Sequence, residues 1–181
     1  MYPEEFDRVV FTTEEISSRV RELGAQITAD LDQDPGSTLA IIGMLKGGFV
    51  FLADLVRVIE LDLTIDFMAI SSYRESTPSS SGVRIVKDLS ESIFERDVLI
   101  VEDIIDTGLT LSYILRNLRE RAPRTLKVCT LLNRTVRRIA PLHIDYSGFE
   151  VGEEYLVGYG LDHLQKWRNL RFICAASGVG P

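Results

Sequence analysis

The sequence is poor in the residues that usually bind metals or form disulfides. Only two cysteines and two histidines occur among 181 residues, and the histidines, His143 and His163, do not stand at a metal-ligand spacing. Cys129 and Cys174 lie far apart in strongly apolar surroundings, which predicts buried thiols in a reducing compartment. The composition therefore argues against a disulfide-stabilised fold and against a zinc site.

The sequence also lacks an excess of positive charge and a long hydrophobic run. Its net charge of -7 argues against non-specific binding to nucleic acid or to an anionic membrane. No apolar run approaches the roughly 20 residues that are needed to cross a bilayer. The polar, acidic stretch 1–7 does not have the character of a signal peptide. We therefore expect a cytoplasmic protein that binds neither nucleic acid nor a membrane.

What the chain does have is enough apolar residues for one core, in strand-like runs that alternate with helical patterns. Hydrophobic residues make up 45% of the chain. Thr12 and Glu15 have the spacing of a capping box before a helix, and the continuous apolar runs 39–42 and 98–101 are typical of strands buried on both faces. Further elements are expected in these ranges: helices at 49–59 and 110–121, and strands at 61–70, 83–86, 126–132, 144–149, 155–157 and 172–175. The alternation predicts an α/β fold with a mainly parallel, twisted sheet flanked by helices, in which ligands bind at the carboxyl ends of the strands.

The segment 98–110 contains the strongest chemical signal. Its apolar strand runs into Glu102 and Asp103, and two adjacent carboxylates at a strand end are unfavourable unless they bind hydroxyls or a cation. The stretch 106–110 (D-T-G-L-T) then opens a helix, where Gly108 permits a tight turn and backbone N–H groups can bind an anion. The segment thus fits a sugar phosphate. A simple helix cap is the structural alternative, but it does not explain the two carboxylates.

With these residues, the segment resembles the 5-phosphoribosyl-1-pyrophosphate (PRPP) motif of the purine phosphoribosyltransferases, most closely that of the hypoxanthine-guanine branch. The similarity extends from Val10 to Ala175. It implies a type I phosphoribosyltransferase fold over a single domain, 1–181, with a small hood built from the N- and C-terminal parts of the chain. It also implies Mg²⁺-dependent transfer of the phosphoribosyl group from PRPP to a 6-oxopurine base, with release of pyrophosphate, and a homodimer or homotetramer.

The resemblance also implies the residues that contact PRPP and the metal. The stretch L-K-G-G at 45–48 resembles the pyrophosphate loop of the family, in which a non-proline cis peptide bond would fall on Leu45-Lys46. Asp106 matches the residue that takes or shares the N7 proton of the purine. The implied PRPP contacts are Lys46, Gly47, Glu102, Asp103, Ile105, Asp106, Thr107, Gly108, Leu109, Thr110 and Arg168. The implied Mg²⁺ ligands are Glu102 and Asp103 for one ion and Asp162 for a second.

The base site implied by the resemblance is formed by two later stretches. Tyr155 matches the aromatic residue that stacks on the purine, and Leu156 matches a position whose backbone contacts the base edge. Arg134 stands where the family usually has a lysine that reaches the purine O6. Because arginine is longer and fork-shaped, Arg134 could read O6, swing toward a phosphate, or be a solvated charge beside Arg137 and Arg138.

A polar, serine-rich stretch is expected to form a mobile lid over this site. Ser72-Tyr73 resembles the start of the lid in the family, and the loop that follows covers about 73–83. Closing such a lid would exclude water from a transition state that resembles an oxocarbenium ion. A disordered surface loop would describe the open state equally well.

Other functions are also compatible with the sequence. A related transferase could act on xanthine or adenine, although a cationic donor at Arg134 disfavours the amine that adenine presents. A PRPP-sensing regulator that binds DNA or RNA is disfavoured by the net charge of -7, by the absence of a helix-turn-helix extension and by the retained Asp106. A nucleotide-binding domain of unknown role is the least specific alternative. Tyr159 and Trp167 are interpreted as packing residues.

Overall fold

The computed structural model describes residues 6–31, 38–74 and 81–176. Helices and strands alternate along most of the chain, as the sequence predicts. In order, the elements are β1 (Phe6–Phe11), α1 (Thr13–Leu31), β2 (Leu39–Leu45), α2 (Phe49–Leu55), β3 (Leu63–Arg74), β4 (Ser81–Lys87), β5 (Asp97–Ile105), α3 (Leu109–Arg119), β6 (Thr125–Asn133), a 3-10 turn (Thr135–Arg137), β7 (Tyr146–Glu150), β8 (Leu156–Val157) and β9 (Ile173–Ala176). Among the described residues, no helix is both long and apolar enough to cross a membrane.

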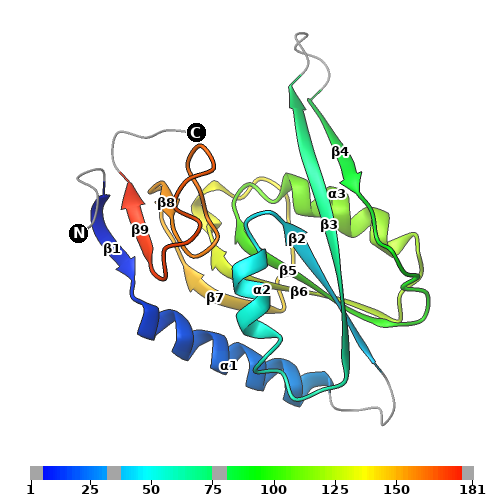
Figure 1. Ribbon diagram of the computed structural model, residues 1–181. Helices are drawn as coiled ribbons and strands as arrows, with labels where there is room; N and C mark the ends of the chain where they lie inside the picture. Colours follow the sequence, from blue (N-terminus) through cyan, green and yellow to red (C-terminus); the bar gives the residue numbers. More distant parts are fainter. Residues whose placement is uncertain (1–5, 32–37, 75–80, 177–181) are drawn as a thin grey trace.

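A six-stranded sheet forms the centre of the molecule, with the strand order β4-β3-β2-β5-β6-β7 (Figure 1). The strands from β3 to β7 in this order run parallel, and β4 pairs antiparallel with β3 at one edge. The chain leaves β2 through α2 toward β3 on one side, and leaves β5 through α3 toward β6 on the other. The strand order therefore reverses between β2 and β5, which is where open α/β sheets bind their ligands.

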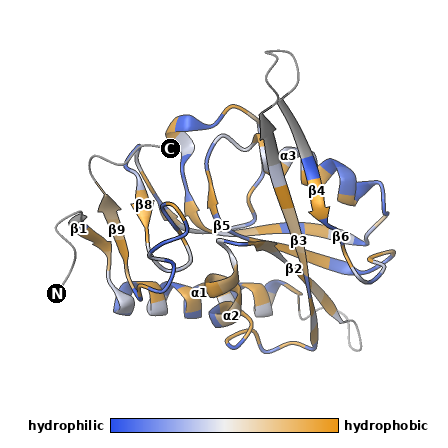
Figure 2. Cartoon of the chain, turned by 45° about the horizontal axis from the view of Figure 1, so that its top comes forward, coloured by the Kyte–Doolittle hydropathy of each residue, from blue (hydrophilic) through white to orange (hydrophobic). Residues whose placement is uncertain are grey.

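The inner strands β2, β5 and β6 of the central sheet are largely buried, and their alternate residues point to opposite faces of the sheet. In β5, Leu99 and Val101 belong to one core cluster together with α1 and α2, whereas Val98 and Ile100 belong to a second cluster together with α3. Figure 2 shows the strands as mostly hydrophobic and α3 with a hydrophilic outer face. The continuous apolar run 98–101 is thus a strand buried on both faces, as the sequence predicts.

A second, three-stranded sheet, with the order β1-β9-β8, forms a hood beside the carboxyl ends of the central strands (Figure 1). β1 pairs antiparallel with β9, and β9 with β8, so the two ends of the chain meet in this sheet. Phe11 stacks on Phe149 with 4.1 Å between ring centroids, which joins the hood to the last strand of the central sheet. The fold class is confirmed, including the hood made from both ends of the chain.

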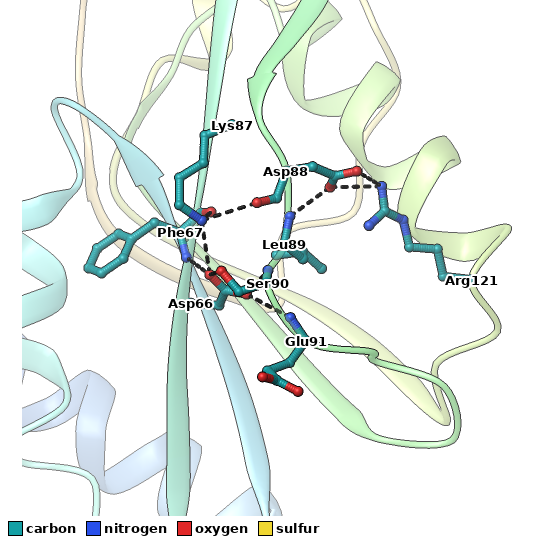
Figure 3. A network of polar contacts seen from close by, with 8 residues as sticks. All are labelled: Asp66, Phe67, Lys87, Asp88, Leu89, Ser90, Glu91 and Arg121. Atoms are coloured by element: carbon teal, nitrogen blue, oxygen red, sulfur yellow. Dashed lines mark hydrogen bonds and ion pairs between the residues drawn. The ribbon is translucent and has the colours of Figure 1, made fainter.

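The hairpin of β3 and β4 extends away from the rest of the molecule, and a polar network fixes its base (Figures 1 and 3). The Asp66 carboxylate accepts hydrogen bonds from the backbone N–H groups of Phe67, at 2.7 Å, and Ser90, at 2.5 Å, and from Lys87 Nζ at 3.1 Å. These hydrogen bonds hold the pKa of Asp66 below its usual value, although burial acts in the opposite direction. The network ties β3 to the segment that follows β4.

The structure changes several element boundaries. β5 continues four residues beyond the predicted run, to Ile105, because it stays paired with β6 through Asn133. The helix expected at 49–59 ends at Leu55, and β1 was not expected from its residues. Of the predicted lid at about 73–83, residues 75–80 lie outside the described residues, while 73–74 and 81–83 belong to β3 and β4.

Candidate active site

Two loops meet where the strand order reverses. β2 ends at Leu45, and the Leu45-Lys46 peptide bond that follows is cis, as the resemblance implies. A Cβ atom added to Gly47 would lie 1.6 Å from the Asp103 carboxylate oxygen Oδ2 on β5. Any residue other than glycine would therefore displace that carboxylate.

Two neighbouring cavities open around this contact, and Gly47 and Asp103 line both of them. The smaller cavity measures about 210 Å³ and is lined by Met44, Leu45, Gly47, Ile70, Glu102, Asp103 and Thr110. The larger cavity measures about 360 Å³ and is lined by Lys46, Gly47, Asp103, Ile104, Arg134, Tyr155, Leu156, Leu161, Asp162 and Arg168. The larger one lies between the end of the central sheet and the hood.

The adjacent carboxylates of Glu102 and Asp103 hold protons more tightly than free side chains. Burial raises the pKa of Asp103 to about 6, although a hydrogen bond from the backbone N–H of Ile104 and the charge of Arg168 act in the opposite direction. Burial, followed by the charge of Asp103, raises the pKa of Glu102 well above its usual value. A cation bound between the two would remove this repulsion.

The loop at 106–110 has the form that an anion site requires. Gly108 has a φ of 78° and directly precedes α3, so the free N–H groups of the first helical turn open on this loop. A Cβ atom at Gly108 would lie 2.7 Å from Leu142 and 3.0 Å from Arg138, so the following segment encloses the glycine. Thr107 accepts hydrogen bonds at its backbone oxygen from Ile139 and Ala140. The loop is thus held from behind by the segment 138–142.

Arg134 is buried and held by three groups. Its Nε donates to the backbone oxygen of Gly152 at 2.7 Å, and its Nη2 donates to that of Glu154 at 2.6 Å. Its Nη1 lies 3.4 Å from Asp106 Oδ2, and Arg137 Nη1 lies 3.3 Å from the same oxygen. Of the three possibilities that the sequence left open, a solvated charge is wrong, because only 6% of Arg134 is exposed.

Asp106 has one oxygen that no group satisfies. While Oδ2 faces the two arginines, Oδ1 is buried and has no hydrogen-bond partner among the described residues. Buried polar atoms in native proteins are almost always paired, and an exception often marks a functional position. Arg138 also holds the backbone here, since its Nε donates to the Asp106 carbonyl at 3.1 Å.

A tight turn of the hood lies directly against the Lys46-Gly47 loop. Gly160 has a φ of 99°, and a Cβ atom there would lie 2.2 Å from the backbone oxygen of Gly47. In the same turn, the Tyr159 hydroxyl donates to Asp54 Oδ2 on α2 at 2.6 Å. The turn is thus fixed both to the loop and to the helix that follows it.

The residues after this turn gather charge at the mouth of the larger cavity. Asp162 and Arg168 form an ion pair at 2.6 Å. The Gln165 side-chain oxygen Oε1 accepts hydrogen bonds from Lys46 Nζ at 3.3 Å and from Arg168 Nη2 at 3.4 Å. Two cations thus converge on one neutral oxygen, an arrangement that suits the arrival of an anion.

Tyr155 is positioned by the same part of the hood. Its hydroxyl donates to the backbone oxygen of Asp162 at 3.0 Å, and its ring contacts His163 edge-on with 5.6 Å between centroids. His163 in turn stacks on Trp167. The ring of Tyr155 is thus held in place at the wall of the larger cavity.

Most of the predicted site residues line these two cavities or the loop beside them, but Ile105 does not. The side chain of Ile105 is buried in the core against α3, so its predicted contact with PRPP remains a prediction. Sequence reasoning missed Ile104 and Leu161, which line the larger cavity, and the contacts of Gln165 and Arg138. Ile104 and Leu161 resemble ordinary core residues in the sequence, so no local signal distinguishes them. Ser72 and Tyr73 lie in β3.

The comparison with known proteins agrees with this geometry. The family described as the phosphoribosyl transferase domain matches residues 10–164. The hypoxanthine-guanine phosphoribosyltransferase of Mycobacterium avium is 47% identical over 96% of this chain and 87% of its own. The chain belongs to the hypoxanthine-guanine phosphoribosyltransferase family. Another member, from Bacillus subtilis, is 45% identical over 96% of this chain and 94% of its own.

Solved structures of this family have the same fold. A hypoxanthine-guanine phosphoribosyltransferase from Bacillus anthracis superposes with a TM-score of 0.87 at 40% identity, over 95% of this chain and 99% of that one. A hypoxanthine phosphoribosyltransferase from Staphylococcus aureus gives 0.88 at 42% identity, over 95% and 92%. Membership of the family therefore rests on sequence and structure alike.

Proposed function

We propose that this chain is a purine salvage enzyme that transfers the phosphoribosyl group of PRPP to hypoxanthine, guanine or both, giving IMP or GMP and pyrophosphate. The observation that carries the proposal is the larger cavity. It brings Lys46 and Asp103, from the ends of two central strands, together with Arg134 and the hood residue Tyr155. The meeting of the Lys46-Gly47 loop and an aromatic ring in one cavity of about 360 Å³ supports a pyrophosphate site and a base site that lie side by side.

PRPP binds across both cavities in this proposal. The N-terminus of α3, at 106–110, takes the 5-phosphate, and the ribose hydroxyls face Glu102 and Asp103. The pyrophosphate lies against Lys46, Gly47 and Arg168, where the Gln165 oxygen would otherwise hold the two cations. Charge that develops on the leaving pyrophosphate is thereby stabilised by fixed cations and by backbone N–H groups.

The donor atoms of this site fit Mg²⁺. Among the described residues, no three side chains of the metal-binding types gather around one point. Mg²⁺ does not need such a cluster, because it keeps several waters and binds through one or two carboxylates together with substrate phosphates. Glu102 and Asp103 would hold one ion, and Asp162, already paired with Arg168, would hold a second through the pyrophosphate. The ion would supply charge neutralisation at the leaving group.

The chemical step needs one proton acceptor from the chain. The purine N9 attacks the anomeric carbon as the bond from that carbon to the pyrophosphate oxygen breaks, through an oxocarbenium-like transition state. The electron pair leaves with the pyrophosphate, and the purine loses the proton on N7 to Asp106. The unpartnered oxygen of Asp106 is suited to accept it, since it is buried and has no other donor among the described residues.

Discrimination among bases would come from Arg134 and Tyr155. Arg134 Nη1 donates to a carbonyl at O6 and cannot accept from the amine that adenine carries there. Tyr155 stacks on the purine, and the backbone of Leu156 meets the base edge. We also propose that the enzyme acts in the cytoplasm as a homodimer or homotetramer, on the resemblance alone.

The first test is an assay of PRPP turnover with hypoxanthine, guanine, xanthine and adenine, with and without EDTA. We expect turnover of hypoxanthine or guanine, lost when EDTA removes Mg²⁺ and restored by added Mg²⁺. Preference for adenine would contradict the proposed reading of O6, and preference for xanthine, which also carries O6, would contradict the proposed choice of hypoxanthine or guanine. PRPP binding without turnover of any base would favour a PRPP sensor instead.

A further inference from the structure

The segment between β7 and β8 leads to Tyr155, the residue proposed to stack on the base, but makes few backbone hydrogen bonds. Gly152, Glu153 and Glu154 are exposed and belong to no strand. Among the residues that the structure describes, no backbone N–H donates to the carbonyl oxygens of Gly152 or Glu154. Among the described residues, its backbone–backbone hydrogen bonds lie at its two ends, where Val151 donates to the Asn133 carbonyl and the Tyr155 carbonyl accepts from Ala176.

The Arg134 guanidinium supplies what this segment lacks. Its Nε and Nη2 donate at 2.7 and 2.6 Å to the backbone oxygens of Gly152 and Glu154, on either side of Glu153. Arg134 comes directly after β6, and its backbone N–H donates to the Ile105 carbonyl at 3.0 Å, so the side chain starts from a fixed point in the central sheet. The planar Arg134 guanidinium, whose backbone is fixed to the central sheet, thus holds the segment 152–154 in place.

The third nitrogen of the Arg134 guanidinium, Nη1, makes only a long contact with the described residues and can donate to a ligand. Nη1 lies 3.4 Å from Asp106 Oδ2, at the long end of the range for an ion pair, and the other oxygen of Asp106 is unpartnered. A base edge entering here meets a donor from Arg134 and an acceptor from Asp106 side by side. One guanidinium therefore fixes the wall of the base site and the group that faces the base.

We propose that Arg134 is a positioning residue that clamps the segment 152–154, and through it Tyr155, onto the central sheet, in addition to donating to the base. This role rests on the proposed transfer to a 6-oxopurine, and it assigns two of the three contacts of the Arg134 side chain to holding the segment 152–154. Lysine has one nitrogen on a flexible stem and cannot reach both carbonyls while it faces Asp106. A lysine at position 134 would therefore keep the positive charge but lose the two hydrogen bonds to the segment 152–154.

The test is Arg134→Lys in the full chain, which keeps the charge and removes the fork. We expect the KM for hypoxanthine to rise about ten-fold or more, since the Gly152 and Glu154 carbonyls lose the donor that holds the segment, while the KM for PRPP changes less than about two-fold, because the PRPP contacts lie on other loops. The fluorescence of Trp167, the only tryptophan of the chain, should also change without ligand and show weaker binding of IMP.

Arg8→Ala is the matched control. Arg8 pairs with the Glu154 side chain on the outer, exposed side of the same segment, and exposed pairs of this kind contribute little. We expect wild-type constants for Arg8→Ala. An Arg134→Lys enzyme with the wild-type KM for hypoxanthine, or one in which both KM values rise together, would overturn the clamp. Failure of the proposed function would show differently, as a wild-type protein that turns over no base.

Discussion

At the scale of single residues, Asp106 connects the phosphate loop to the base site. Its backbone belongs to the turn that precedes α3, while its carboxylate faces Arg134 and Arg137 at 3.4 and 3.3 Å. Because PRPP is proposed to bind mainly through backbone N–H groups and neighbouring side chains, removing the charge of Asp106 should separate binding from chemistry.

We predict that Asp106→Asn lowers kcat by roughly 10²- to 10⁴-fold, the usual contribution of a positioned acid or base. The KM for PRPP should stay within about two-fold, because the amide keeps the shape of the side chain. Steady-state kinetics with hypoxanthine and Mg²⁺ would measure both quantities. Asp88→Asn, which changes an exposed carboxylate paired with Arg121, is the control and should retain full activity. Unchanged turnover in Asp106→Asn would remove this residue from proton transfer.

At the scale of elements, the hood turn and α2 behave as one unit with the pyrophosphate loop. Tyr159 lies between two glycines of positive φ, and its hydroxyl donates to Asp54 Oδ2 on α2 at 2.6 Å. Burial, followed by the hydrogen bond to Asp54, raises the pKa of Tyr159, so the hydroxyl stays protonated and keeps donating. Asp162 and Arg168, which line the larger cavity, follow this turn in the sequence.

We predict that Tyr159→Phe raises the KM for PRPP by roughly three- to ten-fold, because a lost buried hydrogen bond of about 1 kcal/mol loosens the turn against the Lys46-Gly47 loop. The KM for hypoxanthine should change less. Tyr113→Phe, on the far face in α3, is the matched control. Equal constants for Tyr159→Phe and wild type would leave Tyr159 as the packing residue that the sequence suggests.

The sequence could predict the core elements because their signals are local. The capping box of Thr12 and Glu15 is confirmed, with the Glu15 N–H donating to Thr12 Oγ1 at 3.2 Å and the Thr12 N–H donating to Glu15 Oε2 at 2.8 Å. The role of Tyr159 could not be predicted, since its partner lies 105 positions away. The same holds for Arg134, whose carbonyl partners belong to a segment without a pattern of its own.

At the scale of the whole molecule, the candidate active site is formed by two sheets, the central sheet from the middle of the chain and the hood from both of its ends. Alternating strands and helices predict the parallel sheet and its carboxyl edge, and therefore the place of Glu102 and Asp103. The hood could be expected only from the resemblance, because it unites β1 and β9 from opposite ends of the chain. Burying the two carboxylates at this edge of the sheet has a consequence for stability, since it takes two like charges out of water.

The sign of that consequence follows from the pKa shifts. Burial raises the pKa of Asp103 to about 6 and that of Glu102 well above its usual value, so between pH 4 and 6 the folded state binds more protons than the unfolded state. The stabilisation from Asp103 is therefore fully present below about pH 4 and is lost as the pH rises through about 6, and that from Glu102 is lost as the pH rises through its raised pKa. Above that pH, the unneutralised pair destabilises the metal-free protein.

We predict that Glu102→Gln raises the Tm of the metal-free protein at pH 8 by about 2–4 °C, which corresponds to about 1 kcal/mol for a chain of this size. The gain should shrink at pH 5, where the wild-type carboxylates carry protons, and saturating Mg²⁺ with PRPP should reverse the order, because the variant has lost a ligand for the ion. Thermal denaturation at both pH values, with and without Mg²⁺ and PRPP, tests all three statements. Asp88→Asn serves as a control for the loss of one exposed charge. A Glu102→Gln protein less stable than wild type at pH 8 without metal would mean that the carboxylate pair is not a source of strain.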